Sequence, residues 1–257
     1  MSAQVKLAAM TGAGIALLSV FPAVALVGGA PEASHGIARS VVMVVGSDRT
    51  FCSGVVIARD LILTAAQCIH PGTRYSIAGL DPPRVLTKVA SAVPHPEWDS
   101  SAILRHRVSA DVGLLKLVTP LPPAYKPVAL ADAMATAGSQ AIVAGYGVTR
   151  DGDGKTGGTL RAADLVVTES PNTRQIRLVD PNTKGESAGL GSCMGDSGGP
   201  VLDASDGRLV VLGIMSWATG HAVLYRTWLH PKGVIEVWLC DDCLEEAQFS
   251  FCAMRST

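Results

Sequence analysis

The apolar residues of this chain occur in many short runs that are separated by turn-forming residues. The 257 residues include 27 glycines and 15 prolines, and no long stretch repeats apolar residues with a helical period. Short apolar runs between clusters of Gly, Pro, Asn and Asp are typical of strands in β-sandwiches and β-barrels. The sequence therefore predicts an all-β fold. The predicted strands cover residues 41–45, 55–57, 61–63, 112–118, 141–144, 165–168, 175–179, 201–202 and 209–215.

The composition of the chain limits the classes of function. With 48% hydrophobic residues the chain can bury a sizeable core, and its length fits one or two domains. The formal net charge is -1 and 17% of the residues are charged. Such a balance does not provide the basic surface of a nucleic-acid-binding protein or a polybasic membrane patch. We therefore expect a globular protein that does not bind nucleic acid.

Residues 1–25 have the pattern of a signal peptide. Lys6 provides the positive charge, residues 7–21 form an apolar run, and Ala23-Val24-Ala25 is a small-residue cleavage site. The alternative is a membrane anchor, but an apolar run of about 15 residues is short for a transmembrane helix. The pattern predicts a secreted or periplasmic protein that has no stable membrane anchor after cleavage. In an oxidising compartment of this kind cysteines can pair.

Two segments contain residue types that suit nucleophilic catalysis. Ser197 lies in the glycine-rich segment 195–200, where a tight turn exposes the hydroxyl and lets backbone N–H groups converge on one point. Asp111 begins the apolar run 111–117, and a carboxylate is costly to bury there without a partner. These residue types are compatible with a serine nucleophile and a buried, partnered acid.

These two segments, together with residues 63–68, resemble the trypsin/chymotrypsin family of serine proteases. Residues 63–68 are similar to the family's catalytic-histidine segment, residues 111–117 to the segment of the orienting aspartate, and residues 195–200 to the nucleophile segment. The resemblance implies two antiparallel Greek-key β-barrels with the active site in the cleft between them. It places an N-terminal barrel in residues 26–125 and a C-terminal barrel in residues 126–257, with an atypical tail from about residue 218.

The chain departs from the family at Gln67, which stands where the family has the histidine that acts as general base. A general base needs a pKa near the working pH and a lone pair directed at the serine hydroxyl, and an amide has no such equilibrium. Loss of the histidine lowers kcat by about 10⁶ in a protease that uses the same triad mechanism, and about 10³–10⁴ of enhancement over water remains. We expect an exported serine endopeptidase that acts through a Ser197 acyl-enzyme and is strongly impaired.

Two alternatives to an impaired enzyme stay open. In the first, the chain is a catalytically inactive homologue that binds peptides or proteins in the same cleft. In the second, Gln67 is an altered residue and the natural protein has histidine, since one nucleotide separates the two codons. A histidine elsewhere in the chain could also replace the base if it lay within hydrogen-bond reach of the nucleophile. The histidines considered, all expected to face solvent on loops, are His70, His95 and His106.

The resemblance implies roles for residues beside the nucleophile. The N–H groups of Gly195 and Ser197 would form the oxyanion hole. Cleavage after residue 25 would free the α-amino group of Leu26, which would form an ion pair with Asp196. This pair shapes the oxyanion hole and the specificity pocket in the family.

The specificity pocket that the resemblance implies has no acidic residue at its base. Gly191 occupies the base position, and Ala218 stands in place of a common wall glycine. Such a pocket should favour small or medium apolar side chains over Lys and Arg. Ser216 would also support Asp111. The pocket residues are Gly191, Ser192, Ser216, Trp217 and Ala218.

The six cysteines divide into a family pair and four others. The resemblance implies a disulfide between Cys52 and Cys68. Four cysteines allow three connectivities, and a disulfide partner for Cys193 is expected among the remaining three. The four are Cys193, Cys240, Cys243 and Cys252.

No metal or cofactor is predicted. Cys240 and Cys243 lack a second ligand pair at zinc spacing. The acidic loop 151–158 lacks the glutamate that an EF-hand calcium loop requires. In the tail, residues 231–234 weakly resemble a family strand, and residues 237–239 weakly resemble part of the family's C-terminal helix.

Overall fold

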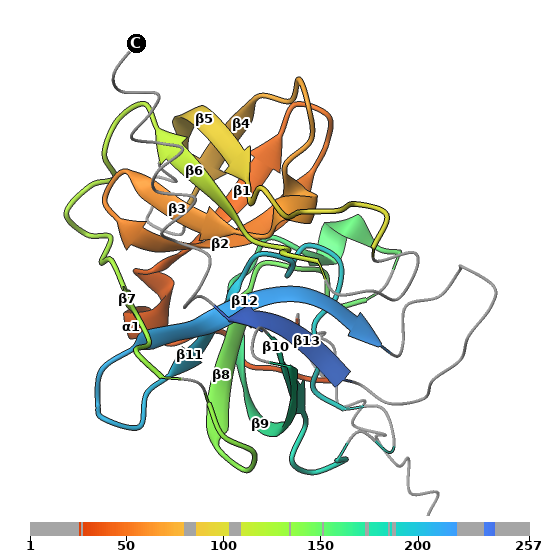
Figure 1. The fold of residues 1–257 in the computed structure, drawn as a ribbon. Coiled ribbons are helices and arrows are strands. Elements are labelled where there is room, and N and C mark those ends of the chain that lie inside the picture. The colour runs from red at the N-terminus through yellow and green to blue at the C-terminus, as the bar shows by residue number, and fades with distance from the viewer. Residues whose placement is uncertain are drawn as a thin grey trace, which may run out of the picture.

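Two β-barrels, one above the other, make up the computed structural model (Figure 1). This arrangement confirms the all-β, two-barrel fold that the sequence predicted. The structure describes residues 26, 28–79, 86–102, 109–133, 135–150, 152–172, 175–184, 186, 189–219 and 234–239. The predicted signal peptide, His106 and the cysteines at positions 240, 243 and 252 lie outside these residues.

The first barrel is closed by six antiparallel strands in the order β1-β2-β3-β6-β5-β4. In β1 every residue except Val45 is buried. Ala144 and Tyr146 of the second barrel belong to the same hydrophobic cluster as β1, and the Tyr146 hydroxyl donates to the Val41 carbonyl at 3.2 Å. The strands are β1 (Val41–Gly46), β2 (Phe51–Ala58), β3 (Leu61–Thr64), β4 (Tyr75–Ala78), β5 (Leu86–Pro94) and β6 (Gly113–Leu117).

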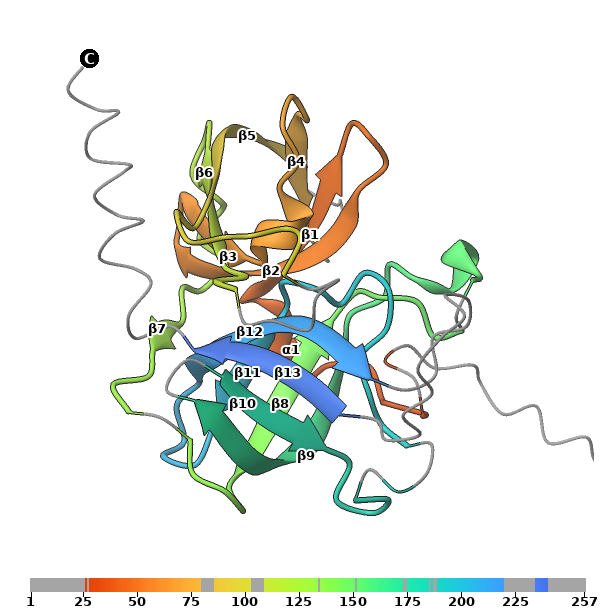
Figure 2. The same cartoon turned by 45° about the vertical axis from the view of Figure 1, so that its right-hand side comes forward.

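The second barrel is a ring of six strands, which Figure 2 shows from the side. The order is β11-β8-β9-β10-β13-β12, and pairing of β11 with β12 closes the ring. The short β7 adds to β12 in parallel. The strands are β7 (Ala129–Leu130), β8 (Gln140–Gly145), β9 (Arg161–Asn172), β10 (Gln175–Val179), β11 (Pro200–Asp203), β12 (Val210–Thr219) and β13 (Val234–Leu239).

The helices within the described residues are short. They are α1 (His35–Ala38), η1 (Ala66–Cys68) and η3 (Gly154–Thr156). Across the described ranges, no helix has both the length and the apolar character needed to cross a membrane.

Each strand predicted from an apolar run is present, but four strands had no such signal. The strand β5 alternates apolar residues with Thr87, Lys88 and Ser91, so it contains no continuous run. Residues 237–239, compared above with a helix, belong to β13 instead, and that prediction was wrong. Pairing with β10 on one side and β12 on the other gives this segment backbone partners that a local pattern does not reveal.

The segment that follows the predicted cleavage site packs against the second barrel. Leu26 and Ala30 are fully buried in that barrel's core. Glu32 forms an isolated bridge with Arg161 at the start of β9. The region around Leu26 is therefore held close to the barrel that contains Ser197.

Candidate active site

Ser197 lies on the turn that leads into β11, where the two barrels meet. Its carbonyl accepts a hydrogen bond from the backbone N–H of Ser53 in the first barrel at 2.9 Å. The next residue, Gly198, donates its N–H to the Met215 carbonyl of β12 at 2.8 Å. Gly198 has φ +81°, and a β-carbon there would lie 2.1 Å from Thr64 Oγ1. The turn therefore requires glycine after the serine and is fixed by both barrels.

Ser53 is a positioning residue that the sequence comparison did not identify. Its side chain is fully buried on β2. The hydroxyl donates to the Gly195 carbonyl at 2.8 Å and accepts the Tyr146 N–H at 2.9 Å. The sequence did contain a signal for this role, because Ser53 is a polar residue, between Cys52 and Gly54, inside an otherwise apolar strand. Because it holds the Gly195 carbonyl, Ser53 fixes the orientation of the peptide beside the nucleophile.

The backbone before Ser197 leaves two N–H groups available to a ligand. Gly195 has φ +97°, and a β-carbon there would lie 2.6 Å from the Phe51 ring. Within the part of the chain that the structure describes, the N–H groups of Gly195 and Ser197 donate to no protein acceptor. Donors of this kind, already held in place, can stabilise an oxyanion without reorganising.

Gln67 is hydrogen-bonded to the buried acid Asp111. Its backbone N–H donates to Oδ1 of Asp111 at 2.8 Å, and its Nε2 donates to Oδ2 at 2.7 Å. The same Nε2 donates to the Ser216 carbonyl at 2.5 Å. The Ser216 hydroxyl donates to Asp111 Oδ2, also at 2.5 Å. The structure thus brings together three residues that the sequence selected from distant segments.

The Asp111 carboxylate is 1% exposed. Burial raises its pKa, while hydrogen bonds from Ser216 and Gln67 act in the opposite direction. A carboxylate that accepts several hydrogen bonds can remain charged in such a place. Gln67 therefore supplies the donor that a buried acid requires.

Gln67 is held by hydrogen bonds, but its amide group cannot act as a general base. Both amide hydrogens are used, one by Asp111 and one by Ser216. No hydrogen bond joins Gln67 to Ser197 among the described residues. The remaining atom, Oε1, can accept a hydrogen bond but cannot take a proton near neutral pH. The site therefore has an oriented side chain at the base position and no base.

The disulfide between Cys52 and Cys68 is present, as predicted. It joins β2 to η1, the short helix that contains Gln67. Cys68 is fully buried. The bond therefore ties the turn of Gln67 to the strand that carries Ser53.

Asp196 is fully buried beside the nucleophile. It accepts the N–H of Gly147 at Oδ1 and the N–H of Cys193 at Oδ2, both at 2.8 Å. Burial raises its pKa to about 7, and these two hydrogen bonds lower it only in part. Within the described ranges Asp196 forms no ion pair. A cation beside this buried carboxyl group would stabilise its ionised form and lower its pKa.

The predicted specificity pocket is described on one side. Ser216 is buried on β12, Trp217 is half-buried and Ala218 is exposed. Gly191 is buried and Ser192 is half-buried at the other predicted positions. Residues 220–233 lie outside the described residues, so the opposite wall stays a prediction.

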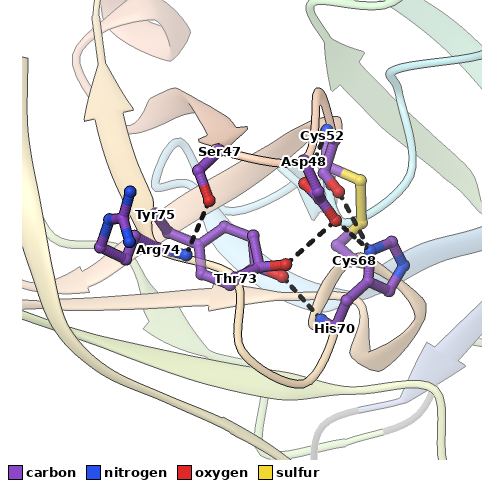
Figure 3. Close-up of polar contacts among 9 residues, drawn as sticks. Ser47, Asp48, Cys52, Cys68, His70, Thr73, Arg74 and Tyr75 are labelled. Atoms are coloured by element: carbon purple, nitrogen blue, oxygen red, sulfur yellow. Dashed lines mark hydrogen bonds and ion pairs between the residues drawn. A yellow bond between two sulfur atoms is a disulfide. The ribbon is translucent and has the colours of Figure 1, made fainter.

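The histidines proposed as replacement bases are engaged elsewhere or not described. His70 Nδ1 lies 2.7 Å from Asp48 Oδ2 on the first barrel (Figure 3). The His70 side chain is half exposed. His95 is 5% exposed, so its prediction as a solvent-facing residue was wrong. Its backbone N–H donates to the Val112 carbonyl, which draws the loop after β5 against β6. His106 lies outside the described residues.

Two barrels with a serine turn and a buried acid between them define the class of trypsin-like serine proteases. Residues 26–229 match the family described as Trypsin, and the chain belongs to that family. Human kallikrein-8 is 30% identical over 179 residues, which are 65% of this chain and 66% of kallikrein-8, slightly under two thirds of that relative's length.

A solved structure supports the fold independently. It is mouse neuropsin, described as a serine protease expressed in the limbic system of mouse brain. The TM-score is 0.62 at 20% identity, and the match covers 88% of this chain and 98% of neuropsin. At this identity the similarity shows the shared fold.

Proposed function

We propose that the chain is an exported serine endopeptidase of the trypsin family whose hydrolysis is strongly impaired by Gln67. The observation that carries this proposal is the hydrogen-bonded set of Gln67, Asp111 and Ser216, together with a Ser197 turn that is hydrogen-bonded to both barrels. The nucleophile, the buried acid and the serine that supports the acid are all present, and only the proton acceptor of the trypsin family is missing. Peptides or proteins are therefore the proposed substrates.

In the proposed reaction Ser197 Oγ adds to a peptide carbonyl, and the oxyanion accepts hydrogen bonds from the N–H groups of Gly195 and Ser197. Collapse of this adduct breaks the C–N bond, and the amine must leave with a proton. A histidine would carry the serine proton to the amine. Gln67 cannot, so the proton must pass through water, and both acylation and deacylation are slow.

Export and activation form part of the same proposal. If signal cleavage frees Leu26, its α-ammonium group would pair with Asp196. Support comes from the complete burial of both residues and from the raised pKa of Asp196, which a nearby cation would lower. N-terminal sequencing of the exported protein tests this step, and a first residue other than Leu26 would contradict it. The Cys52–Cys68 disulfide supports an oxidising compartment.

The deciding experiment compares the chain with Gln67→His, using Ser197→Ala as the control. We expect Ser197-dependent labelling by a fluorophosphonate to be fast in Gln67→His and much slower in the unaltered chain, because Gln67 cannot accept the Ser197 proton. Hydrolysis of a peptide with a small apolar residue before the scissile bond should rise by about 10³-fold or more in Gln67→His. No rise, with peptide binding retained, would favour the alternative of an inactive homologue that binds peptides.

A further inference from the structure

A groove beside Ser197 lies between the first barrel and the loop of residues 148–158 of the second barrel. It encloses about 680 Å³ and includes both Ser197 and Gly195 in its lining. None of the five predicted pocket residues lines it. A peptide with its acyl side chain in the pocket would therefore extend its leaving-group side into this groove.

The lining of the groove is apolar and in part exposed. Among the described residues, three large apolar side chains are exposed, namely Val45, Val118 and Met194. Two of these line the groove, Val45 with 37% and Met194 with 62% of its surface exposed. Val45 is also the one residue of β1 that is not buried. The fold thus exposes apolar surface selectively beside the nucleophile, where a ligand can cover it.

Among the described residues, one charged residue lines this groove, and it is a cation. Arg49 lies on the exposed turn between β1 and β2 with φ 73°, a conformation that costs energy for a residue with a side chain. Its N–H donates to the Gly46 carbonyl at 3.1 Å. No ion pair of Arg49 occurs within the described ranges. The guanidinium is therefore available to an anionic partner.

The neighbouring residue Asp48 braces this turn. Its Oδ1 accepts the Thr50 N–H at 2.9 Å, and its Oδ2 binds His70 Nδ1 at 2.7 Å and the Thr73 hydroxyl at 3.1 Å (Figure 3). The Asp48 carboxylate is thus hydrogen-bonded to Thr50, His70 and Thr73. Arg49 is the charged side chain that lines the groove among the described residues.

We propose that this groove selects the leaving-group side of the substrate: large apolar residues directly after the scissile bond, followed by an acidic residue that meets Arg49. The apolar part rests on Val45, Met194 and the ring of Phe51, and the acidic part rests on Arg49. The inference builds on the proposed function, since it assumes that a peptide lies across Ser197.

Binding to the unaltered chain tests the proposal without requiring hydrolysis. Fluorescent peptides share one small apolar residue on the acyl side and carry Leu-Leu-Glu-Glu, Leu-Leu-Gln-Gln or Gly-Gly-Glu-Glu after it. We expect the glycine peptide to bind about tenfold more weakly, because two apolar side chains lose their cover. The glutamine peptide should bind about two- to fivefold more weakly at low salt, as expected for an exposed ion pair.

Two variants with matched controls identify the residues. Arg49→Glu should reverse the charge preference, so that a Leu-Leu-Lys-Lys peptide binds better than Leu-Leu-Glu-Glu, a gain that partial unfolding cannot produce. Arg208→Glu, an exposed site outside the groove, should leave the preference unchanged. Met194→Ser should reduce the preference for leucine over glycine, whereas Val118→Ser should not.

The outcomes separate this inference from the proposed function. Equal affinity for all peptides, or an unchanged charge preference in Arg49→Glu, would overturn the groove assignment. If Gln67→His hydrolyses peptides but shows no leaving-side preference, the groove assignment fails and the proposed function stands. If it neither hydrolyses peptides nor reacts with a fluorophosphonate, the proposed function fails.

Discussion

Burial of Asp196 should make the free energy of unfolding depend on pH. The folded pKa is about 7, whereas an unfolded aspartate titrates near 3.9. Between these values the folded chain binds a proton that the unfolded chain does not. The stability is therefore fully present below about pH 4 and is lost as the pH rises through 7. A shift of about three units corresponds to about 4 kcal/mol.

The measurement is urea unfolding between about pH 4.5 and about pH 8, the range that the two pKa values span. The chain must keep residues before Leu26, so that no α-amino group can pair with Asp196. In Asp196→Asn the loss with pH should be smaller by about 4 kcal/mol. Asp111, whose pKa is also raised, contributes a slope that both proteins share. Asparagine cannot accept the Cys193 N–H at its nitrogen, which lowers stability equally at every pH.

Identical pH slopes for the chain and Asp196→Asn would refute this reasoning. A second comparison tests the proposed pairing. In a protein that begins at Leu26, the α-ammonium group should stabilise the ionised carboxylate and remove most of the slope. Retention of the full slope in that protein would show that Leu26 does not reach Asp196.

Three further predictions use the same unfolding assay. Ser53→Ala should cost about 2–4 kcal/mol, because two buried backbone groups lose their partner, while Ser139→Ala, where the hydroxyl of a half-buried residue donates to the Thr136 carbonyl, should cost no more than about 1 kcal/mol. Replacing Cys52 and Cys68 together by alanine should cost about 3 kcal/mol, as for a loop of this size, and a change near zero would contradict that view. Ser197→Ala should stay within about 0.5 kcal/mol of the unaltered chain, since the hydroxyl makes no hydrogen bond within the described residues, and in the Gln67→His background it should abolish fluorophosphonate labelling.

The sequence predicted those parts of the site that lie within local segments. The Ser197 turn could be predicted because its glycines are adjacent in sequence and each answers a steric need, as the contact at Gly198 shows. Asp111 could be predicted because an acid in an apolar run needs a partner. Strands with continuous apolar runs could be predicted because the run itself is a local pattern.

Residues whose role depends on distant contacts were not predicted. Ser53 acts through Gly195 and Tyr146, which lie far away in the chain. The strand β13 depends on pairing with β10 and β12, and no local pattern encodes it. His95 is buried because its loop folds back on Val112. In each case tertiary contact decided the outcome.

The site can be divided into parts that the fold needs and parts that it does not. The fold needs glycine at position 198 and a hydrogen-bond donor beside the buried Asp111, and Gln67 supplies that donor. An apolar residue at position 67 would leave the carboxylate with one side-chain donor fewer, at a cost of about 1–3 kcal/mol. Glutamine thus keeps the donor that the buried carboxylate needs, and it lacks a group that can accept the serine proton. The hydroxyl of Ser197 has no such structural role, so its presence is explained by a ligand or a reaction. This is why a single change at position 67 is expected to restore chemistry without rebuilding the site.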